Sequence, residues 1–257
     1  MTYESVTYEI TNGVATITLN RPEALNAITL ELARDWRTAL HEAGRDEQVR
    51  CIVITGAGRG FCAGADLRTI QSKPIGDLLR QDYHPILKLI TETPKPVLAA
   101  INGAAVGAGA NFALACDMRH MADNASFGEV FVRIGVIPDS GGHYFLPRIV
   151  GAAKAFELMA TGEIIKADEA HRLGLVNRVF SAEELMPRTQ EFAERLAQAP
   201  TLVLGMIKQG LRHTFAQDLD TVLDFEASGQ ERVSHSEDFQ EGIQSFLEKR
   251  PPRFKGR

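Results

Sequence analysis

Two glycine-rich segments, residues 56–67 and 101–111, are the parts of this sequence most able to do chemistry. Each follows a short apolar run that predicts a buried strand, and each leads toward a predicted helix. Backbone N–H groups in such a loop face an anionic atom with the helix dipole behind them. A single glycine-rich loop of this kind is more simply interpreted as a tight turn after a strand. Two side by side could direct two N–H groups at one oxygen, which is an oxyanion hole.

The same glycines raise the alternative of a nucleotide site, which their spacing disfavours. Counted from Gly56 or from Gly107, the last glycine of a G-x-G-x-x-G motif is replaced by Phe61 or Phe112. The phosphate-binding pattern G-x-x-x-x-G-K-[ST] is absent from the sequence. The oxyanion-hole interpretation is therefore favoured.

The elements that position these loops are predicted to alternate between strands and helices. Residues 3–10 and 14–19 predict a hairpin around Asn12-Gly13, and Thr29 is expected to cap a helix that runs to about Gly44. The pattern of strand, loop and helix predicts an α/β fold of stacked ββα units. Further along the chain, buried strands are predicted at 51–55 and 97–101. Helices are predicted at about 76–91, from 108 onward, and at 151–160, 167–173, 182–198, 201–214, 218–233 and 236–249.

Composition limits the class of protein. The chain has 257 residues, of which 44% are hydrophobic and 24% charged, and this balance excludes disorder of the whole chain. The formal net charge of -5 provides no basic field for nucleic acid, so no nucleic-acid partner is expected. The three cysteines are odd in number and widely spaced, which favours reduced thiols over disulfides or a metal site. We expect a cytoplasmic protein without a metal.

One uncharged stretch, residues 97–116, is long enough to span a bilayer. It contains two asparagines and several glycines, however, and amides are costly in lipid. A buried strand, a glycine turn and a buried helix explain the stretch better, and no secretory signal is visible at the N-terminus. No membrane association is expected.

Five segments in a fixed order carry a family resemblance: TITLNRPEALNA, IVITGAGRGFCAGADL, PKPVLAAINGAAVGAGANFALACD, ASFGEVFVRIGVIPDSGG and LPRIVG. They resemble the crotonase, or enoyl-CoA hydratase/isomerase, superfamily. The elements GAGRGFCAG, GAGA, IPD-x-GG and LPR are most similar to the isomerase of bacterial phenylacetate breakdown. The resemblance implies a spiral core of ββα units with the CoA and acyl site at 1–195, and a C-terminal helical trimerisation region at 196–257.

The resemblance also implies the substrate and the assembly. It implies an acyl-CoA thioester as substrate, no cofactor beyond that CoA, and a homotrimer or a dimer of trimers. The two oxyanion donors would be the N–H groups of Ala65 and Ala108. A further set of residues would line the substrate: Ala24, Ala63, Gly64, Asp66, Leu67, Gly107, Asn111 and Phe131.

The sequence departs from the hydratases of the family at two positions. These hydratases use two glutamates to activate water and to deliver a proton, and the resemblance aligns them with Asn111 and Phe131. Glu129 lies two residues from Phe131 but does not match the motif, and we interpret it as a surface glutamate.

A third carboxylate, Asp139, follows the apolar stretch Ile134–Ile137 and precedes a predicted turn or helix. In several isomerases of the family an aspartate at this place faces the substrate, so the resemblance implies a catalytic base. The alternative is a helix N-cap, which would lower the pKa of the carboxyl and weaken it as a base.

Three functions remain open. The first is an isomerase in which Asp139 moves a double bond from the β,γ to the α,β position. The second is an enoyl-CoA hydratase with a rearranged acid/base pair, such as Asp139 with Glu129. The third is a CoA-binding protein without catalysis, against which the intact donor loops argue.

Overall fold

The computed structural model describes residues 3–68 and 73–257, and a six-stranded sheet forms the centre of the fold. Strands β1 (Val6–Thr11) and β2 (Val14–Leu19) pair antiparallel, as the predicted hairpin requires, and the remaining pairs are parallel. The sheet continues with β3 (Cys51–Gly56), β5 (Val97–Ile101), β7 (Met118–Ala122) and β10 (Arg178–Phe180). The buried strands at 51–55 and 97–101 are confirmed.

A second sheet takes two of its four strands from the glycine-rich segments. It consists of β4 (Gly60–Cys62), β6 (Ala104–Val106), β8 (Ser126–Gly128) and β9 (Ile164–Lys166), in that order. The interpretation of 56–64 and 102–107 as glycine turns was therefore incomplete. Buried backbone groups must find hydrogen-bond partners, and the two glycine-rich segments find them in each other through the parallel pairing of β4 and β6.

The helices of the first half form where the sequence predicts them. Helix α1 (Leu30–Arg45) begins with the Thr29 side chain accepting a hydrogen bond from the N–H of Leu32. The predicted helix at 76–91 consists of α2 (Ile75–Leu78), a π-helical turn (Leu79–Tyr83) and α3 (His84–Glu92). Helix α4 (Ala108–Ala115) has all eight residues buried, which explains its composition of small and apolar residues. The uncharged stretch 97–116 thus contains strand β5, the short strand β6 and a buried helix.

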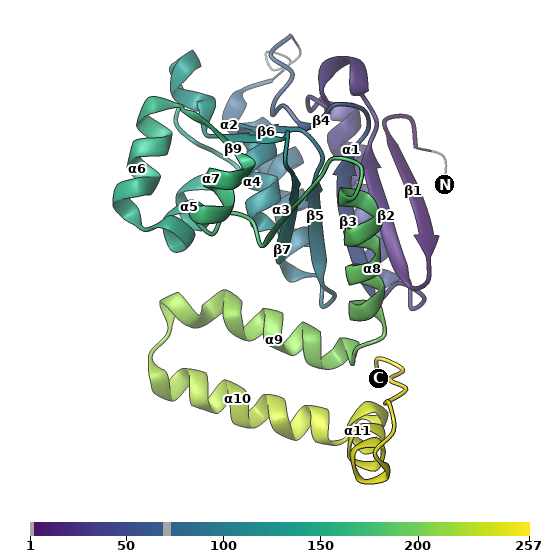
Figure 1. Cartoon of the computed structure of the whole chain (residues 1–257). Helices are drawn as coiled ribbons and strands as arrows, with labels where there is room; N and C mark the ends of the chain where they lie inside the picture. Colours follow the sequence, from purple (N-terminus) through teal and green to yellow (C-terminus); the bar gives the residue numbers. More distant parts are fainter. Residues whose placement is uncertain (1–2, 69–72) are drawn as a thin grey trace.

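The second half is mostly helical. The turn or helix expected after Asp139 is a helix, α5 (Gly142–Val150). The six helices predicted with bounds from residue 151 onward are confirmed. They are α6 (Ala152–Thr161), α7 (Ala167–Arg172), α8 (Leu185–Ala197), α9 (Thr201–His213), α10 (Leu219–Ser234) and α11 (Glu237–Glu248). Figure 1 shows α9, α10 and α11 extending below the two sheets. The boundary after residue 195 lies in the last turn of α8, and the division into two regions stays a prediction.

Arg50, a partly buried arginine, is one of the side chains that connect the C-terminal region to the core. The guanidinium of Arg50, just before β3, donates to the carbonyl oxygens of Ala199 and Phe254 and to the hydroxyl of Thr201. These partners lie at the start of α9 and in the tail after α11. The C-terminal tail therefore returns to the core, as Figure 1 shows.

Close contact between the two glycine-rich segments depends on Gly109. A Cβ atom at this position would lie 2.1 Å from the carbonyl oxygen of Cys62, which is a backbone atom and cannot swing away. We expect Gly109→Ala to destabilise the protein by roughly 1–3 kcal/mol or more, because the two segments must separate. Chemical denaturation followed by circular dichroism measures this.

Gly44→Ala in α1 is the matched control. Its added Cβ would meet only the side chain of Thr93, at 3.3 Å, and alanine favours a helix interior. If the Gly109 and Gly44 variants unfolded at the same denaturant concentration, the close packing of the two segments would not limit stability.

Candidate active site

Two backbone donors lie at the contact between the glycine-rich segments. Ala65 follows Gly64 just after β4, and Ala108 is the first residue of α4. Gly64 has a φ of +82°, and a Cβ there would lie 3.0 Å from the oxygen of Val106 and 3.3 Å from the nitrogen of Ala108. A side chain at position 64 would thus fill the space in front of Ala108. Within the described residues, neither the N–H of Ala65 nor that of Ala108 has an acceptor.

A cavity of about 1030 Å³ opens in front of these donors. Its lining is mainly apolar, and a few titratable side chains and hydroxyls interrupt it. Such a shape is typical of sites that bind small molecules or cofactors. The lining comprises Ala63, Gly64, Ala65, Leu67, Ile75, Leu79, His84, Val106, Gly107, Ala108, Val130, Phe131, Arg133, Ile134, Val136, Ile137, Pro138, Asp139, Ser140, Gly141, Gly142, His143, Tyr144 and Ile164.

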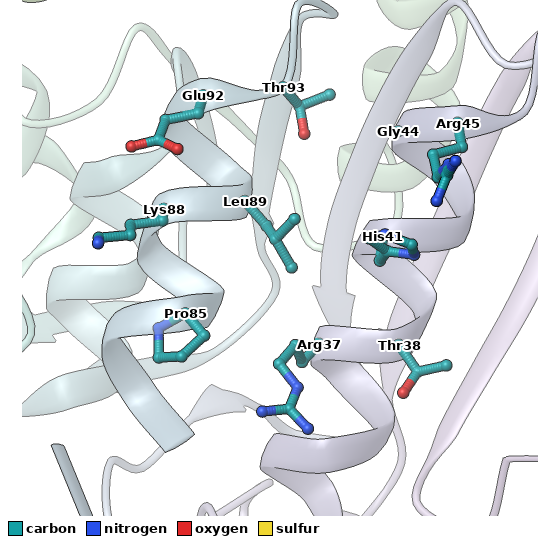
Figure 2. A pocket seen from close by; sticks show the side chains of 10 residues that line it. All are labelled: Arg37, Thr38, His41, Gly44, Arg45, Pro85, Lys88, Leu89, Glu92 and Thr93. Carbon is teal, nitrogen blue, oxygen red and sulfur yellow. The ribbon is translucent and has the colours of Figure 1, made fainter. Parts of the chain in front are cut away.

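A second hollow of about 640 Å³ lies between α1 and α3. Figure 2 shows Arg37, His41 and Arg45 on α1, and on α3 it shows Leu89 pointing toward α1 while Lys88 and Glu92 point away from it. Neither Ala65 nor Ala108 belongs to this lining. The chemistry predicted from the glycine-rich segments therefore belongs to the larger cavity.

Asp139 brings a carboxylate into the larger cavity. It lies in the segment between a 3-10 turn (Val130–Ile134) and α5, and its Oδ1 is buried without a hydrogen-bond partner among the described residues. The N-cap of α5 is Gly141, and no side chain caps that helix. The interpretation of Asp139 as a helix N-cap is therefore wrong. Burial raises the pKa of Asp139, which suits a base that must accept a proton from carbon.

Glu129 is buried, so its interpretation as a surface glutamate is wrong. Its side chain is 0% exposed, and its Oε2 accepts a hydrogen bond of 3.3 Å from Nδ2 of Asn111. The same Nδ2 donates at 2.9 Å to the backbone oxygen of Asp139. Burial, with the charge of Asp139 adding to it, raises the pKa of Glu129 to about 8, although the bond from Asn111 opposes the shift.

Sequence reasoning missed the burial of Glu129 because an isolated glutamate carries no periodic pattern. The nearest clue was its apolar surroundings, since Phe127, Val130 and Phe131 flank it closely in the chain. Strand β8 ends at Gly128 and the 3-10 turn begins at Val130, so Glu129 lies at the bend between them. This bend turns its side chain inward, which local sequence does not reveal.

The residues predicted to contact substrate divide into two groups. Ala63, Gly64, Leu67, Gly107 and Phe131 line the cavity together with the two donors and Asp139.

The other three, Ala24, Asp66 and Asn111, do not line it. The carboxylate of Asp66 is instead paired with Arg21 at 3.2 Å and with Arg68 at 3.1 Å, and these bonds lower its pKa, chiefly the one from Arg68. Ala24 ends a short 3-10 turn (Pro22–Ala24), and Asn111 lies behind the cavity wall.

The fold and the site define a crotonase-type protein, in which ββα units bring two free loop donors to an apolar cavity. The sequence matches the family described as enoyl-CoA hydratase/isomerase over residues 9–257, and the chain belongs to this family.

Similar proteins agree with this assignment. The 1,2-epoxyphenylacetyl-CoA isomerase of Escherichia coli is 40% identical over 260 residues, covering 99% of each chain. The crotonyl-CoA hydratase of Syntrophomonas wolfei is 35% identical over 261 residues, again covering 99% of each chain. The crystal structure of an enoyl-CoA hydratase from Bacillus anthracis is 34% identical, with a TM-score of 0.93, and the match covers 99% of this chain and 100% of that one. The protein is thus an enoyl-CoA hydratase/isomerase family enzyme.

The structure also bears on whether the chain has membrane-spanning helices or metal sites. Among the helices of residues 3–68 and 73–257, none combines the length and apolar character that a membrane crossing requires. Within the same residues, no group of three or more potential ligands is placed to hold a metal ion.

Proposed function

We propose that this enzyme moves the double bond of an enoyl-CoA thioester from the β,γ to the α,β position. The observation that carries the proposal is one carboxylate, Asp139, in an apolar cavity that also holds two free backbone donors. The positions that the resemblance assigns to the two hydratase glutamates are occupied by Asn111 and Phe131, neither of which can transfer a proton.

The proposed reaction needs one base. The thioester oxygen accepts hydrogen bonds from the N–H groups of Ala65 and Ala108. The carboxylate of Asp139 takes the α-proton, and the electrons of the broken C–H bond form the enolate, whose charge rests on that oxygen. The protonated Asp139 then delivers the same proton to the γ-carbon, and the double bond settles between the α- and β-carbons. No cofactor beyond the CoA of the substrate is required.

The apolar lining supports this outcome over addition of water. Phe131, Val130 and Ile164 border the cavity, and such side chains leave few polar groups to hold an attacking water. The size of the cavity is compatible with a ring-bearing acyl group as well as a linear one. A substrate series should therefore include both kinds, since one relative is named as an isomerase of an epoxyphenylacetyl thioester.

A hydratase with Asp139 and Glu129 as its acid/base pair is the second candidate. The observation that favours this candidate is that Glu129 is buried and is connected to Asp139 by the hydrogen bonds of the Asn111 amide. One observation argues against this candidate. Glu129 does not line the cavity, so a water molecule or an α-carbon in the cavity is not in direct contact with Glu129.

A product assay separates these candidates. The purified protein is incubated with β,γ-enoyl-CoA and, separately, with α,β-enoyl-CoA, and the thioesters are identified by chromatography and mass. We expect the β,γ double bond to move without net hydration. Rapid hydration without movement of the double bond would favour the second candidate, and binding of both thioesters without turnover would indicate a non-catalytic CoA-binding protein.

We propose further that the protein forms a homotrimer or a dimer of trimers. Large apolar side chains of the C-terminal region are exposed in the single chain, among them Phe215 at 71%, Phe246 at 83% and Leu247 at 75%. Exposed apolar surface of this kind is typical of contacts between subunits. Light scattering coupled to size-exclusion chromatography measures the mass of the assembly.

A further inference from the structure

A buried polar group behind Asp139 has no task in the one-base reaction. It consists of Glu129, which is 0% exposed, and Asn111, also 0% exposed, on α4. One amide nitrogen joins the two to the base, because Nδ2 of Asn111 donates both to Oε2 of Glu129 and to the backbone oxygen of Asp139. Both N–H bonds of that amide are thereby used.

The surroundings of Glu129 do not compensate a negative charge. Within the described part of the chain it forms no ion pair, and its Oε1 has no hydrogen-bond partner. Helix α4 and strand β6 carry no charged residue, and on β9 the only charged residue is Lys166, which is exposed to solvent. Among the residues that the structure describes, the charged side chain that acts on Glu129 is that of Asp139, which is also negative. A buried carboxylate without a partner is costly, so this environment favours the neutral acid.

Asn111 is placed to connect the base with the oxyanion hole. It lies on α4 three residues after Ala108, whose N–H is the second donor, and so belongs to the same first turn of the helix. The amide of Asn111 also packs closely against Gly142. A Cβ atom added to Gly142 would lie only 2.6 Å from Nδ2 of Asn111. The amide therefore sits between the helix that carries a donor and the segment that carries the base.

We propose that Glu129 is a positioning residue: as a neutral acid it fixes the amide of Asn111, which holds the backbone of Asp139 at a set distance from the oxyanion donors. The proposal rests on the proposed function, in which Asp139 is the base. Without Glu129, one N–H of Asn111 has no acceptor, and the amide is free to turn away from Asp139.

Kinetics of two variants test the positioning role. Glu129→Gln keeps a neutral side chain of the same shape and an oxygen that can accept from Asn111, so its kcat should stay within a few-fold of the wild type. Glu129→Ala removes the acceptor, and kcat should fall roughly tenfold to a hundredfold with little change in KM, because misplacement of a reacting group costs this much. Glu163→Gln, at an exposed glutamate on the turn before β9, is the matched control and should not differ from the wild type.

Two kinetic results would overturn the proposal. If Glu129→Ala kept the wild-type kcat, the contact would have no role in positioning the base. If Glu129→Gln lost as much activity as Glu129→Ala, the proton of Glu129 itself would take part in the chemistry. The effects of Glu129→Ala and Asn111→Ala should also be smaller in combination than their sum, because both act through one amide.

Thermal stability tests the neutral acid without any substrate. The pKa of Glu129 is raised from 4.5 to about 8, so the stability that its proton contributes is complete below pH 4.5 and is lost as the pH rises toward about 8. The Tm of Glu129→Gln should therefore increase relative to the wild type across this interval. A constant difference in Tm would overturn the assignment of a neutral acid.

These measurements separate the inference from the proposed function. A wild-type protein that does not isomerise any enoyl-CoA contradicts the proposed function, and the pH dependence of Tm still reports the state of Glu129. An active wild type whose Glu129→Ala variant is equally active contradicts the inference alone.

Discussion

Replacement of Asp139 by asparagine is expected to lower kcat for isomerisation of β,γ-enoyl-CoA by roughly 10²–10⁴-fold, the usual contribution of a positioned acid–base group. The amide has nearly the same shape as the carboxyl but cannot accept the α-proton. The cavity lining and both backbone donors remain, so KM should change little. Initial rates measured by chromatography of the thioesters, at several substrate concentrations, separate kcat from KM.

The structure offers a matched control for this substitution. Asp123 is exposed in the turn after β7, and Asp123→Asn should retain wild-type kinetics. The fold of the Asp139 variant should be intact, because Asp139 forms no ion pair within the described residues and a neutral amide is less costly to bury than a carboxylate. An Asp139→Asn protein with full activity would remove Asp139 from the mechanism.

Replacement of Ala108 by proline is expected to lower kcat/KM by roughly 10²–10³-fold, the usual cost of losing one oxyanion-hole donor. Proline has no N–H, and Ala108 is the first residue of α4, a position at which helices accept proline. Gly107 before it has a φ of +56° and no Cβ to crowd the ring. The variant therefore removes one donor from the thioester oxygen while α4 can still form. The proline ring also enters the space in front of the nitrogen, which adds to the loss.

Ala152→Pro provides the same substitution away from the cavity. Ala152 is exposed, is the first residue of α6 and also follows a glycine of positive φ, Gly151 at +78°. We expect this control to keep wild-type activity and a wild-type circular dichroism spectrum. If Ala108→Pro were as active as the control, the N–H of Ala108 would not contribute to the reaction.

The two substitutions probe separate parts of the reaction. Asp139→Asn removes the group that carries the proton, whereas Ala108→Pro weakens the stabilisation of the enolate charge. Exchange of the α-protons with deuterium from solvent distinguishes them, because it reports enolate formation even where no product accumulates. Loss of exchange in both variants is expected, since the enolate needs the base and the donor together.

Much of the fold follows from local patterns in the sequence. The strands β3 and β5 are short apolar runs, the hairpin turns at Asn12-Gly13, and α1 begins at the cap of Thr29. Each of these depends on residues within a few positions of one another, so the sequence alone predicts them. The strands of the second sheet contain only three residues each, which is too short for a periodic pattern, and they form because distant segments meet.

The two proposed oxyanion donors were predictable for a similar reason. They are backbone groups, and their positions depend on glycine-rich turns whose residue types are visible in the chain. Gly64 needs a positive φ, and Gly109 must let α4 approach the backbone of Cys62 closely. These requirements persist whatever side chains surround the site, so the resemblance placed Ala65 and Ala108 in segments that do line the cavity.

The electrostatic state of the carboxylates was decided by the tertiary structure. Asn111 reaches Glu129 across 18 residues of sequence and Asp139 across 28, and neither separation has a periodic pattern. Burial and hydrogen-bond partners set a pKa, and both come from segments that meet only after folding. The sequence by itself therefore determined the buried strands β3 and β5, the hairpin turn and the segments that carry the two proposed backbone donors. Only the folded chain decided that Asp139 faces the cavity without capping a helix, and that Glu129 lies buried behind it.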